Sequence, residues 1–141
     1  MKITFCSSYV LVLLLVAWLF MSSSLVRAKY HVNLTNGLAE NSKLIAHCQS
    51  KENDLGTREL YFGDSFDWKF TPNVWGTTLF YCDVSWNNLN LHFDIFKTNR
   101  DWYRCVQKEQ VFDCRWIAQE DGFYFYNRLS QSFELEYPWP R

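Results

Sequence analysis

Apolar and polar residues alternate along most of the chain after residue 28, and this period of two constrains the fold more than any other feature. The alternation recurs in short segments that span residues 30–34, 44–48, 66–70, 78–86, 89–95, 114–118 and 123–126. A period of two is typical of strands that bury one face and leave the other in water. No stretch after residue 28 has comparable helical spacing, so the sequence predicts an all-β domain.

Turn-forming residues separate these segments, as at Asn36-Gly37 and Gly63-Asp64. Such residues accept positive φ or hydrogen-bond to their own backbone. Asp121-Gly122 lies between two strand-like runs and is the strongest hairpin signal in the chain. About seven or eight short strands with regular turns indicate a small antiparallel β-sandwich. The prolines within residues 137–141 exclude a central strand there and predict a tail or an edge segment.

The first 28 residues have the features of a secretory leader. Lys2 supplies a positive charge, residues 9–21 form an apolar run, and Val26-Arg27-Ala28 resembles a cleavage site. The apolar run is shorter than the about 20 residues that a membrane-spanning helix needs. We expect residues 1–28 to be a signal peptide cut after Ala28, with a signal anchor or a buried helix as the alternatives. Residues 29–141 then form one secreted, extracellular domain, and no membrane insertion is expected because no second apolar run follows.

The charge of the expected mature chain argues against anionic polymers as partners. Removal of Lys2 and Arg27 leaves 12 of the 14 basic residues against all 15 acidic ones, a formal charge of −3. Nucleic-acid binding and attachment to anionic membranes depend on excess positive charge. The composition therefore predicts neither kind of partner.

The cysteine count supports an oxidising compartment. Loss of the leader removes Cys6 and leaves the even set Cys48, Cys82, Cys105 and Cys114. A small secreted domain with four cysteines is expected to hold two disulfides. A zinc site is the alternative, although no closely spaced cysteine pair supports it. Three pairings are possible; we favour Cys48–Cys82 with Cys105–Cys114, because the second pair could close one hairpin.

Catalytic and metal-binding patterns are weak. His31, His47 and His92 lie far apart at alternating strand positions, where partly exposed side chains are the usual occupants. Glu134 and Glu136 form a pair of a kind that can serve glycoside hydrolysis, but solubilising an edge strand is the favoured interpretation. The sequence therefore predicts no enzyme activity, no metal ion and no cofactor.

Two further features concern the surface. Asn33-Leu34-Thr35 is the only N-glycosylation sequon, so Asn33 is a candidate glycan site. Trp75 and Trp102 lie in loop-like segments, where they are either exposed anchors for a partner or caps over the ends of the sandwich. Capping is the favoured interpretation. The abundance of aromatic residues also raises a sugar-binding face as a possibility.

Several short motifs follow one another in a fixed order after the leader. They are Val32-Asn33-Leu34-Thr35-Asn36, Cys48-Gln49-Ser50-Lys51, Asp54-Leu55-Gly56, the alternating run 66–70, the run 78–82, Cys114-Arg115-Trp116 and Glu120-Asp121-Gly122-Phe123-Tyr124. In order and spacing they resemble the plant self-incompatibility protein family, the S-protein homologues. The gap from Cys105 to Cys114 is longer than the spacing usual in that family.

The resemblance implies a small secreted β-sandwich with two disulfides and a non-enzymatic role as a signalling ligand, in self-incompatibility or another form of plant cell–cell recognition. We expect a monomer that binds a cell-surface protein receptor through its loops. The first candidate loop is 98–102, with Arg100, Asp101 and Trp102, and the second is 51–56, with Asp54. The alternative is a secreted carbohydrate-binding or wall-polysaccharide-acting protein.

Overall fold

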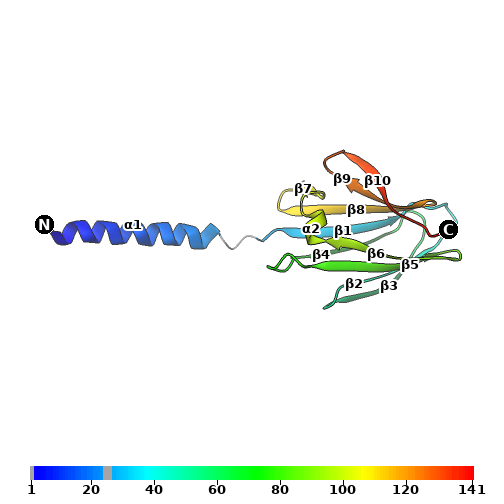
Figure 1. Cartoon of the computed structure of the whole chain (residues 1–141), viewed down its shortest axis with the longest axis horizontal. Coiled ribbons are helices and arrows are strands. Elements are labelled where there is room, and N and C mark those ends of the chain that lie inside the picture. The colour runs from blue at the N-terminus through cyan, green and yellow to red at the C-terminus, as the bar shows by residue number, and fades with distance from the viewer. Residues whose placement is uncertain (1, 24–26) are drawn as a thin grey trace.

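The computed structural model describes residues 2–23 and 27–141, and its domain consists of two β-sheets packed face to face (Figure 1). A long helix, α1, precedes the domain, and a single helical turn, α2, interrupts it. The elements are α1 (Lys2–Ser23), β1 (Lys29–Asn36), β2 (Leu44–Gln49), β3 (Asp54–Leu60), β4 (Ser65–Phe70), β5 (Leu79–Trp86), β6 (Leu89–Lys97), α2 (Thr98–Asp101), β7 (Val106–Lys108), β8 (Val111–Gln119), β9 (Gly122–Asn127) and β10 (Ser132–Pro138).

The predicted sandwich is confirmed, with two differences in detail. The first sheet has the order β10-β9-β8-β1-β4, with β7 paired to one half of β8, and the second has the order β3-β2-β5-β6. The described residues thus form ten strands rather than seven or eight. The pairing of β1 with β8 is parallel, whereas every other strand pair is antiparallel. Alternation along a strand reports burial but not direction, so the sequence pattern did not reveal the parallel pair.

The core lies between the inward faces of the sheets and is filled largely by aromatic rings. In β1, for example, Tyr30, Val32 and Leu34 are buried while the residues between them are partly exposed. Ring contacts connect the two sheets, as where Phe93 of β6 lies with its ring centroid 5.5 Å from that of Trp116 of β8. Burial of such large apolar side chains is the main stabilising contribution in a domain of this size.

Both favoured disulfides are present. Cys48 and Cys82 face each other directly across β2 and β5. Cys105, which precedes β7, is bonded to the inward-facing Cys114 of β8. The first bond links the two central strands of the second sheet, β2 and β5. The second links the loop that follows α2 to β8, the middle strand of the first sheet.

The segments that the alternation did not predict as strands lack a regularly buried face. In β3 only Leu60 is buried, and its first residues fall within the predicted loop 51–56. The C-terminal segment is the predicted edge segment as far as Pro138, because β10 is the edge strand of the first sheet, and Trp139 is buried after it. The Trp139 indole donates a hydrogen bond to the backbone oxygen of Gln119 at 2.9 Å.

The predicted hairpin at Asp121-Gly122 is confirmed, since β8 and β9 are joined by residues 120–121. Gly122 has a further role, because the backbone of β10 passes very close to it. A Cβ atom at this position would lie 2.4 Å from the backbone oxygen of Tyr137, so no other residue fits without movement.

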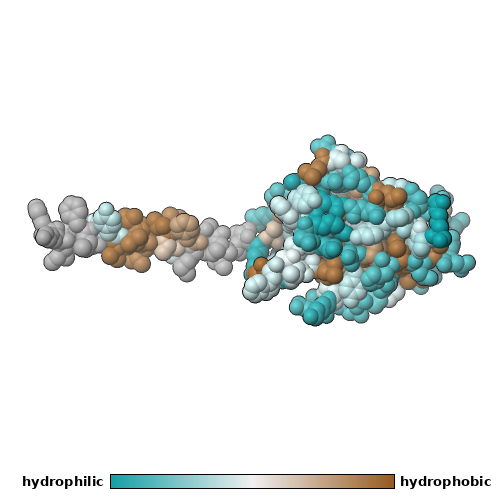
Figure 2. Space-filling view, viewed as in Figure 1, coloured by the Kyte–Doolittle hydropathy of each residue, from teal (hydrophilic) through white to brown (hydrophobic). Residues whose placement is uncertain are grey.

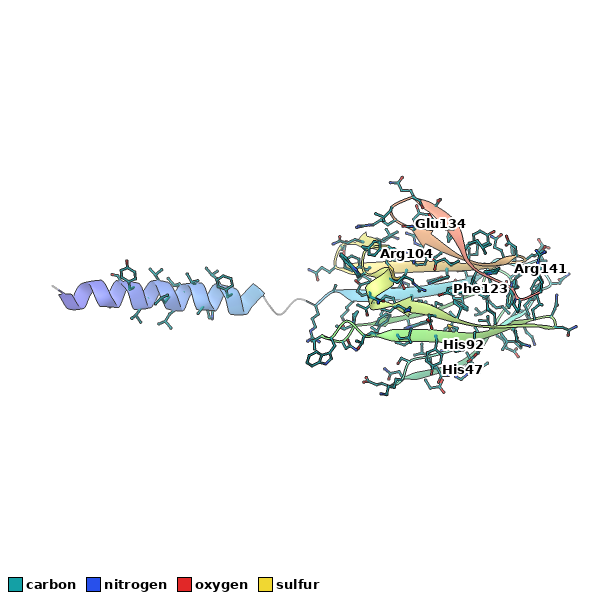
Figure 3. All side chains as sticks on the ribbon, viewed as in Figure 1. His47, His92, Arg104, Phe123, Glu134 and Arg141 are labelled. Atoms are coloured by element: carbon teal, nitrogen blue, oxygen red, sulfur yellow. A yellow bond between two sulfur atoms is a disulfide. The ribbon has the colours of Figure 1, made fainter. Side chains whose placement is uncertain are left out.

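The sandwich has two distinct ends, which are defined by β1. At the end where β1 begins, here called the loop end, lie the connections 50–53, 71–78, 98–105, 109–110 and 128–131. At the opposite end lie 37–43, 61–64, 87–88, 120–121 and the C-terminus. Figure 3 shows Arg104 toward the loop end and Arg141 at the opposite end.

Helix α1 stands apart from the sheets, beyond the loop end (Figure 1). Its described side chains form the largest apolar region in Figure 2, whereas the visible face of the domain is mostly polar. Among the described residues no helix is long and apolar enough to cross a membrane. The predicted leader, residues 1–28, includes residues 1 and 24–26, which lie outside the described residues.

Candidate functional site

The connection between β4 and β5 is a loop held by the side chain of Asn73. The Asn73 amide oxygen accepts the backbone N–H of Thr77 at 3.0 Å, and its amide nitrogen donates to the Thr77 hydroxyl at 2.9 Å. The backbone N–H of Asn73 donates to the hydroxyl of Thr78 at 2.8 Å. Gly76 adopts a positive φ of 69°, which closes the turn at no steric cost. The segment is therefore ordered, and Val74 and Trp75 form its tip.

The connection between β6 and β7 is ordered by a buried carboxylate. Asp101 has 0% of its surface exposed. It accepts two hydrogen bonds from the Arg100 guanidinium, at 2.9 and 2.8 Å, and one from the backbone N–H of Lys97 at 2.9 Å. Burial alone would lower the pKa of Arg100, but the hydrogen bonds and the charge of Asp101 outweigh it and raise the pKa. This bidentate pair holds α2 and the residues after it in one conformation.

The same network connects the loop to the edge strand β10. Arg104 lies 3.4 Å from the Asp101 carboxylate and donates to Glu136, and its guanidinium lies over the ring of Phe125 at 4.4 Å. Arg100 donates to the Tyr137 hydroxyl at 2.7 Å. The charges of Arg100 and Arg104 are therefore paired with those of Asp101 and Glu136. These contacts hold β10 against the α2 loop.

These two ordered loops display exposed aromatic side chains. Trp75 is 83% exposed, Trp102 is 59% exposed and Tyr103 is 39% exposed. The loops adjoin through Thr98, whose backbone N–H and hydroxyl both donate to the backbone oxygen of Thr78, at 3.2 and 3.3 Å. We call this group, Val74, Trp75, Trp102 and Tyr103, the aromatic patch. Large apolar side chains that a rigid backbone holds in water are typical of interaction sites.

The structure divides the predicted loop 98–102 into two roles. Trp102 is exposed, whereas Arg100 and Asp101 are used inside the network, so the Asp101 carboxylate has no surface to offer a partner. The capping interpretation of Trp75 and Trp102 is wrong, because both indoles extend into solvent. Sequence reasoning did not single out Arg104 or Tyr103, and it considered Glu136 only as a partner of Glu134 and not as a partner of Arg104. The only available signal was the cluster of Arg and Asp residues just before Cys105.

Asp54, in the second predicted loop, is the first residue of β3 and lies at the edge of the other sheet. Its carboxylate accepts the backbone N–H of Gly56 at 2.9 Å and contacts the His47 imidazole at 2.7 Å. These hydrogen bonds, chiefly the one from Gly56, lower the pKa of Asp54. The structure thus places Asp54 at the loop end but in a separate polar group from the aromatic patch.

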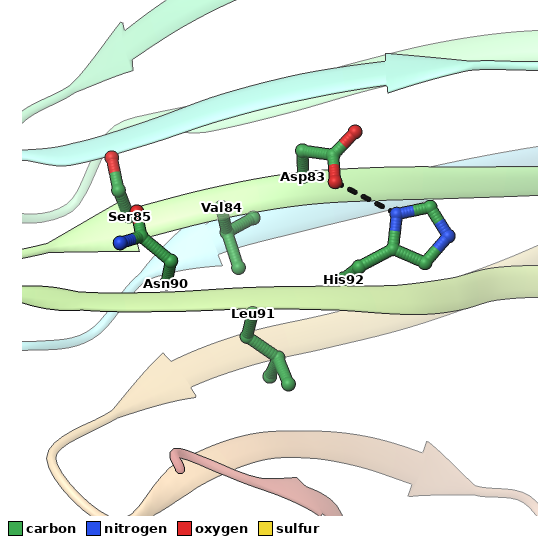
Figure 4. Close-up of a pocket in the computed structure, with 6 residues that line it drawn as sticks. All are labelled: Asp83, Val84, Ser85, Asn90, Leu91 and His92. Atoms are coloured by element: carbon green, nitrogen blue, oxygen red, sulfur yellow. Dashed lines mark hydrogen bonds and ion pairs between the residues drawn. The ribbon is translucent and has the colours of Figure 1, made fainter.

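The outer face of the β5–β6 pair bears a depression of about 430 Å³. Figure 4 shows its lining residues and the ion pair in which His92 Nδ1 lies 2.7 Å from the Asp83 carboxylate. An imidazole held by a carboxylate needs a nucleophile on its other side to form a triad. In the part of the chain that the structure describes, no hydroxyl or thiol hydrogen-bonds to His92. Among the described residues, the depression therefore holds an exposed His–Asp ion pair on a sheet surface, and no triad is assembled around it.

The Glu134–Glu136 pair does not have the properties of a glycosidase pair. Glu136 is engaged by Arg104, and hydrogen bonds from Ser130 and Asn127 lower the pKa of Glu134. A general acid for glycoside hydrolysis needs a raised pKa instead. Among the described residues, no group of three His, Cys, Asp or Glu side chains is arranged to hold a metal ion.

The remaining candidates lie on the outer face of the first sheet. The His31 ring bridges Asp113, at 3.0 Å from Nδ1, and Asp67, at 2.8 Å from Nε2. Asn33 is half-buried in the middle of β1, and its amide oxygen accepts the hydroxyl of Thr35 at 2.9 Å. This face is therefore polar and is distinct from the aromatic patch.

Fold and site together define a small disulfide-bonded β-sandwich that displays its exposed aromatic residues on connecting loops. The family model described as plant self-incompatibility protein S1 matches residues 31–139. S-protein homolog 29 of Arabidopsis thaliana is 35% identical over 112 residues, which cover 79% of this chain and 78% of that protein. S-protein homolog 2 of the same plant is 36% identical over 112 residues, covering 79% of this chain and 69% of that protein.

The chain therefore belongs to the plant self-incompatibility protein S1 family, the S-protein homologues, as the motifs had indicated. A solved structure of self-incompatibility protein homologues matches the fold with a TM-score of 0.59 at 16% identity, covering 82% of this chain and 97% of that chain. That family is described as widespread, small, highly stable, secreted proteins from plants. This description agrees with the secreted localisation expected from the leader.

Proposed function

We propose that this protein is a secreted, non-enzymatic recognition ligand that binds a cell-surface protein through the aromatic patch. The observation that carries the proposal is the pair of exposed indoles, Trp75 and Trp102, on adjoining loops that dedicated hydrogen bonds hold rigid. Membership of a plant self-incompatibility family supports a role in cell–cell recognition.

The physical advantage of such a site is pre-organisation. Binding costs free energy when side chains and loops must be ordered, and a loop that is already fixed avoids most of that cost. Tryptophan and tyrosine provide large contact areas with few rotatable bonds, and they are enriched among residues that dominate binding energy. The Asp101 network and the Asn73 turn therefore serve binding indirectly, by holding the indoles.

The proposal is tested by comparing two double variants of the protein secreted from the full precursor. Trp75→Ala with Trp102→Ala should weaken binding to intact plant cells at least tenfold. Tyr61→Ala with Phe62→Ala is the matched control, because these rings are 58% and 51% exposed at the opposite end. Both variants should keep the wild-type circular dichroism spectrum. Equal binding by the first variant and the wild type would refute the proposal.

Binding of a wall polysaccharide is the second candidate function, and the same exposed indoles favour it. Aromatic faces in water can stack on sugar rings as well as pack against a protein. Saturable binding to a glycan array that depends on Trp75 and Trp102 would support this candidate over a protein partner. Hydrolysis of the bound glycan is not expected, because the pKa of Glu134 is lowered and Glu136 is paired with Arg104.

We further propose that the active form is a monomer that lacks residues 1–28 and carries a glycan on Asn33. The Asn33 side chain lies on the outer face of the first sheet, away from the aromatic patch, so a glycan there would leave the patch free. Intact mass before and after enzymatic deglycosylation tests the cleavage after Ala28 and the glycan together, and sedimentation velocity tests the monomer.

A further inference from the structure

The two ends of the sandwich differ in charge, although residues 29–141 as a whole are mildly acidic. Counting each connection and the three strand residues next to it, the loop end carries seven exposed or partly exposed basic side chains and five acidic ones: Lys29, Lys51, Lys69, Lys97, Arg100, Lys108 and Arg128, with Glu52, Asp54, Glu109, Asp113 and Glu134. By the same count the opposite end carries three basic and seven acidic ones: Lys43, Arg58 and Arg141, with Glu40, Glu59, Asp64, Asp67, Glu120, Asp121 and Glu136. The formal charge of −3 therefore conceals a basic end and an acidic end.

Two of the basic residues lie next to the loops that carry the aromatic patch. Lys97 pairs with Leu79 at the start of β5 and precedes Thr98, the residue that joins the two aromatic loops. Arg128 follows β9, and its backbone N–H donates to the backbone oxygen of Arg104 at 3.0 Å. Across the described residues neither side chain has a carboxylate within ion-pair distance. Their charges are thus available to a partner that covers the patch.

The acidic side chains at the loop end do not neutralise this region. The Asp54 carboxylate is engaged by His47 and by the Gly56 backbone, at the far edge of the second sheet. Asp101 and Glu136 are engaged by Arg100 and Arg104. Lys97 and Arg128 consequently keep positive charges beside the two aromatic loops, with no carboxylate partner among the described residues.

We infer that the segment of the cell-surface protein that binds the aromatic patch is acidic, with apolar side chains that pack on the indoles. This inference rests on the proposed function and specifies the chemistry of its partner. Charges at the rim of an interface act mainly on the association rate, because complementary potentials steer diffusional encounter. The apolar centre accounts for the lifetime of the complex, and the basic rim accounts for its rate of formation and its selectivity.

The experiment measures association of the secreted protein with immobilised right-side-out plasma-membrane vesicles from plant tissue. Raising NaCl from about 10 to about 100 mM shortens the screening length from about 30 to about 10 Å and should slow association about tenfold. Lys97→Glu with Arg128→Glu should slow association about tenfold at low salt and abolish the salt dependence. The control, Lys43→Glu with Arg141→Glu, adds the same charge at the opposite end and should change the rate less than twofold.

The outcomes separate this inference from the proposed function. If the Trp75→Ala, Trp102→Ala variant loses binding while Lys97→Glu with Arg128→Glu associates at the wild-type rate, the acidic partner is ruled out and the aromatic site stands. If both pairs of variants bind normally, both proposals fail. Vesicles digested with a broad-specificity protease should no longer bind. Binding that survives digestion would point to a glycan or lipid ligand and would overturn the acidic protein segment.

Discussion

The Asp101 carboxylate accepts hydrogen bonds from Arg100 and from the backbone of Lys97, and none of its surface reaches solvent. At the scale of single residues, this group determines whether the α2 loop has one conformation. A buried carboxylate is costly unless it is fully paired, and here Arg100 and Arg104 pair it. Asp101 therefore acts on the site indirectly: its buried carboxylate holds the loop that carries Trp102.

Replacing Asp101 by Ala should lower the free energy of unfolding by about 3–5 kcal/mol, because it leaves the partly buried Arg100 guanidinium without the carboxylate that it hydrogen-bonds. Urea denaturation of the two proteins gives this difference. Asp83→Ala provides the matched control, since it breaks an ion pair with His92 that is exposed on both sides. Such pairs contribute about 0–1 kcal/mol. If the two variants lose the same free energy of unfolding, burial of the Asp101 network does not add to its stabilising effect.

Asp54 gives a prediction for the dependence of stability on pH. Because the Gly56 N–H and His47 lower its pKa in the folded state, the unfolded chain binds more protons near pH 4. The stability that Asp54 contributes should be fully present above its unfolded pKa of about 3.9 and should disappear as pH falls through the lower folded value. Urea midpoints of wild type and Asp54→Asn should therefore differ at pH 6 and converge toward pH 2. A difference between the two urea midpoints that grows as the pH falls would contradict a lowered pKa of Asp54 in the folded state.

At the scale of elements, one disulfide links two strands of a sheet and the other holds a loop against a strand. The Cys48–Cys82 bond joins two strands of the same sheet with a sequence separation of 34. The Cys105–Cys114 bond has a separation of only 9, but it fixes the end of the α2 loop to β8. The first is expected to matter more for the free energy of unfolding, and the second for the position of Trp102.

Replacing each cysteine pair by alanine separates these effects. By loop-closure entropy, loss of Cys48–Cys82 should cost about 4 kcal/mol and loss of Cys105–Cys114 about 3 kcal/mol, measured by denaturation under non-reducing conditions. Only the second variant should lose binding to cells at temperatures where both are folded. Normal binding by the Cys105→Ala, Cys114→Ala variant would show that the bond does not position the loop.

Sequence patterns predicted the elements that bury one face and missed those that do not. Alternation identified β1, β2, β4, β5, β6, β8 and β9, because each places every second side chain in the core. It missed β3, where one residue is buried, and the short strand β7, and it placed α2 within the candidate loop 98–102. For the site, Trp102 is exposed, which is compatible with its place in the candidate loop and contradicts the favoured capping interpretation, and the pattern could not show that Arg100 points inward. That direction depends on Tyr137 and on Asp94, whose backbone oxygen accepts a guanidinium hydrogen bond at 3.0 Å.

At the scale of the whole molecule, the sandwich is a rigid support with unlike ends. One end carries the aromatic patch with the basic side chains Lys97 and Arg128 beside its loops, and the other carries an excess of acidic side chains. Net charge is a poor guide to partners for such a molecule, because a charge of −3 is compatible with a locally positive site. The packed core between the sheets and the two disulfides hold the two ends in place.

Hydroxyl-radical footprinting of the secreted protein, free and bound to plant plasma-membrane vesicles, measures directly which end meets the partner. Trp75 and Trp102 should be oxidised readily in the free protein and protected at least severalfold in the bound state. Tyr61 and Phe62, at the opposite end, should be oxidised equally in both. Protection of Tyr61 and Phe62 with no change at the two indoles would contradict the assignment of the aromatic patch as the binding site.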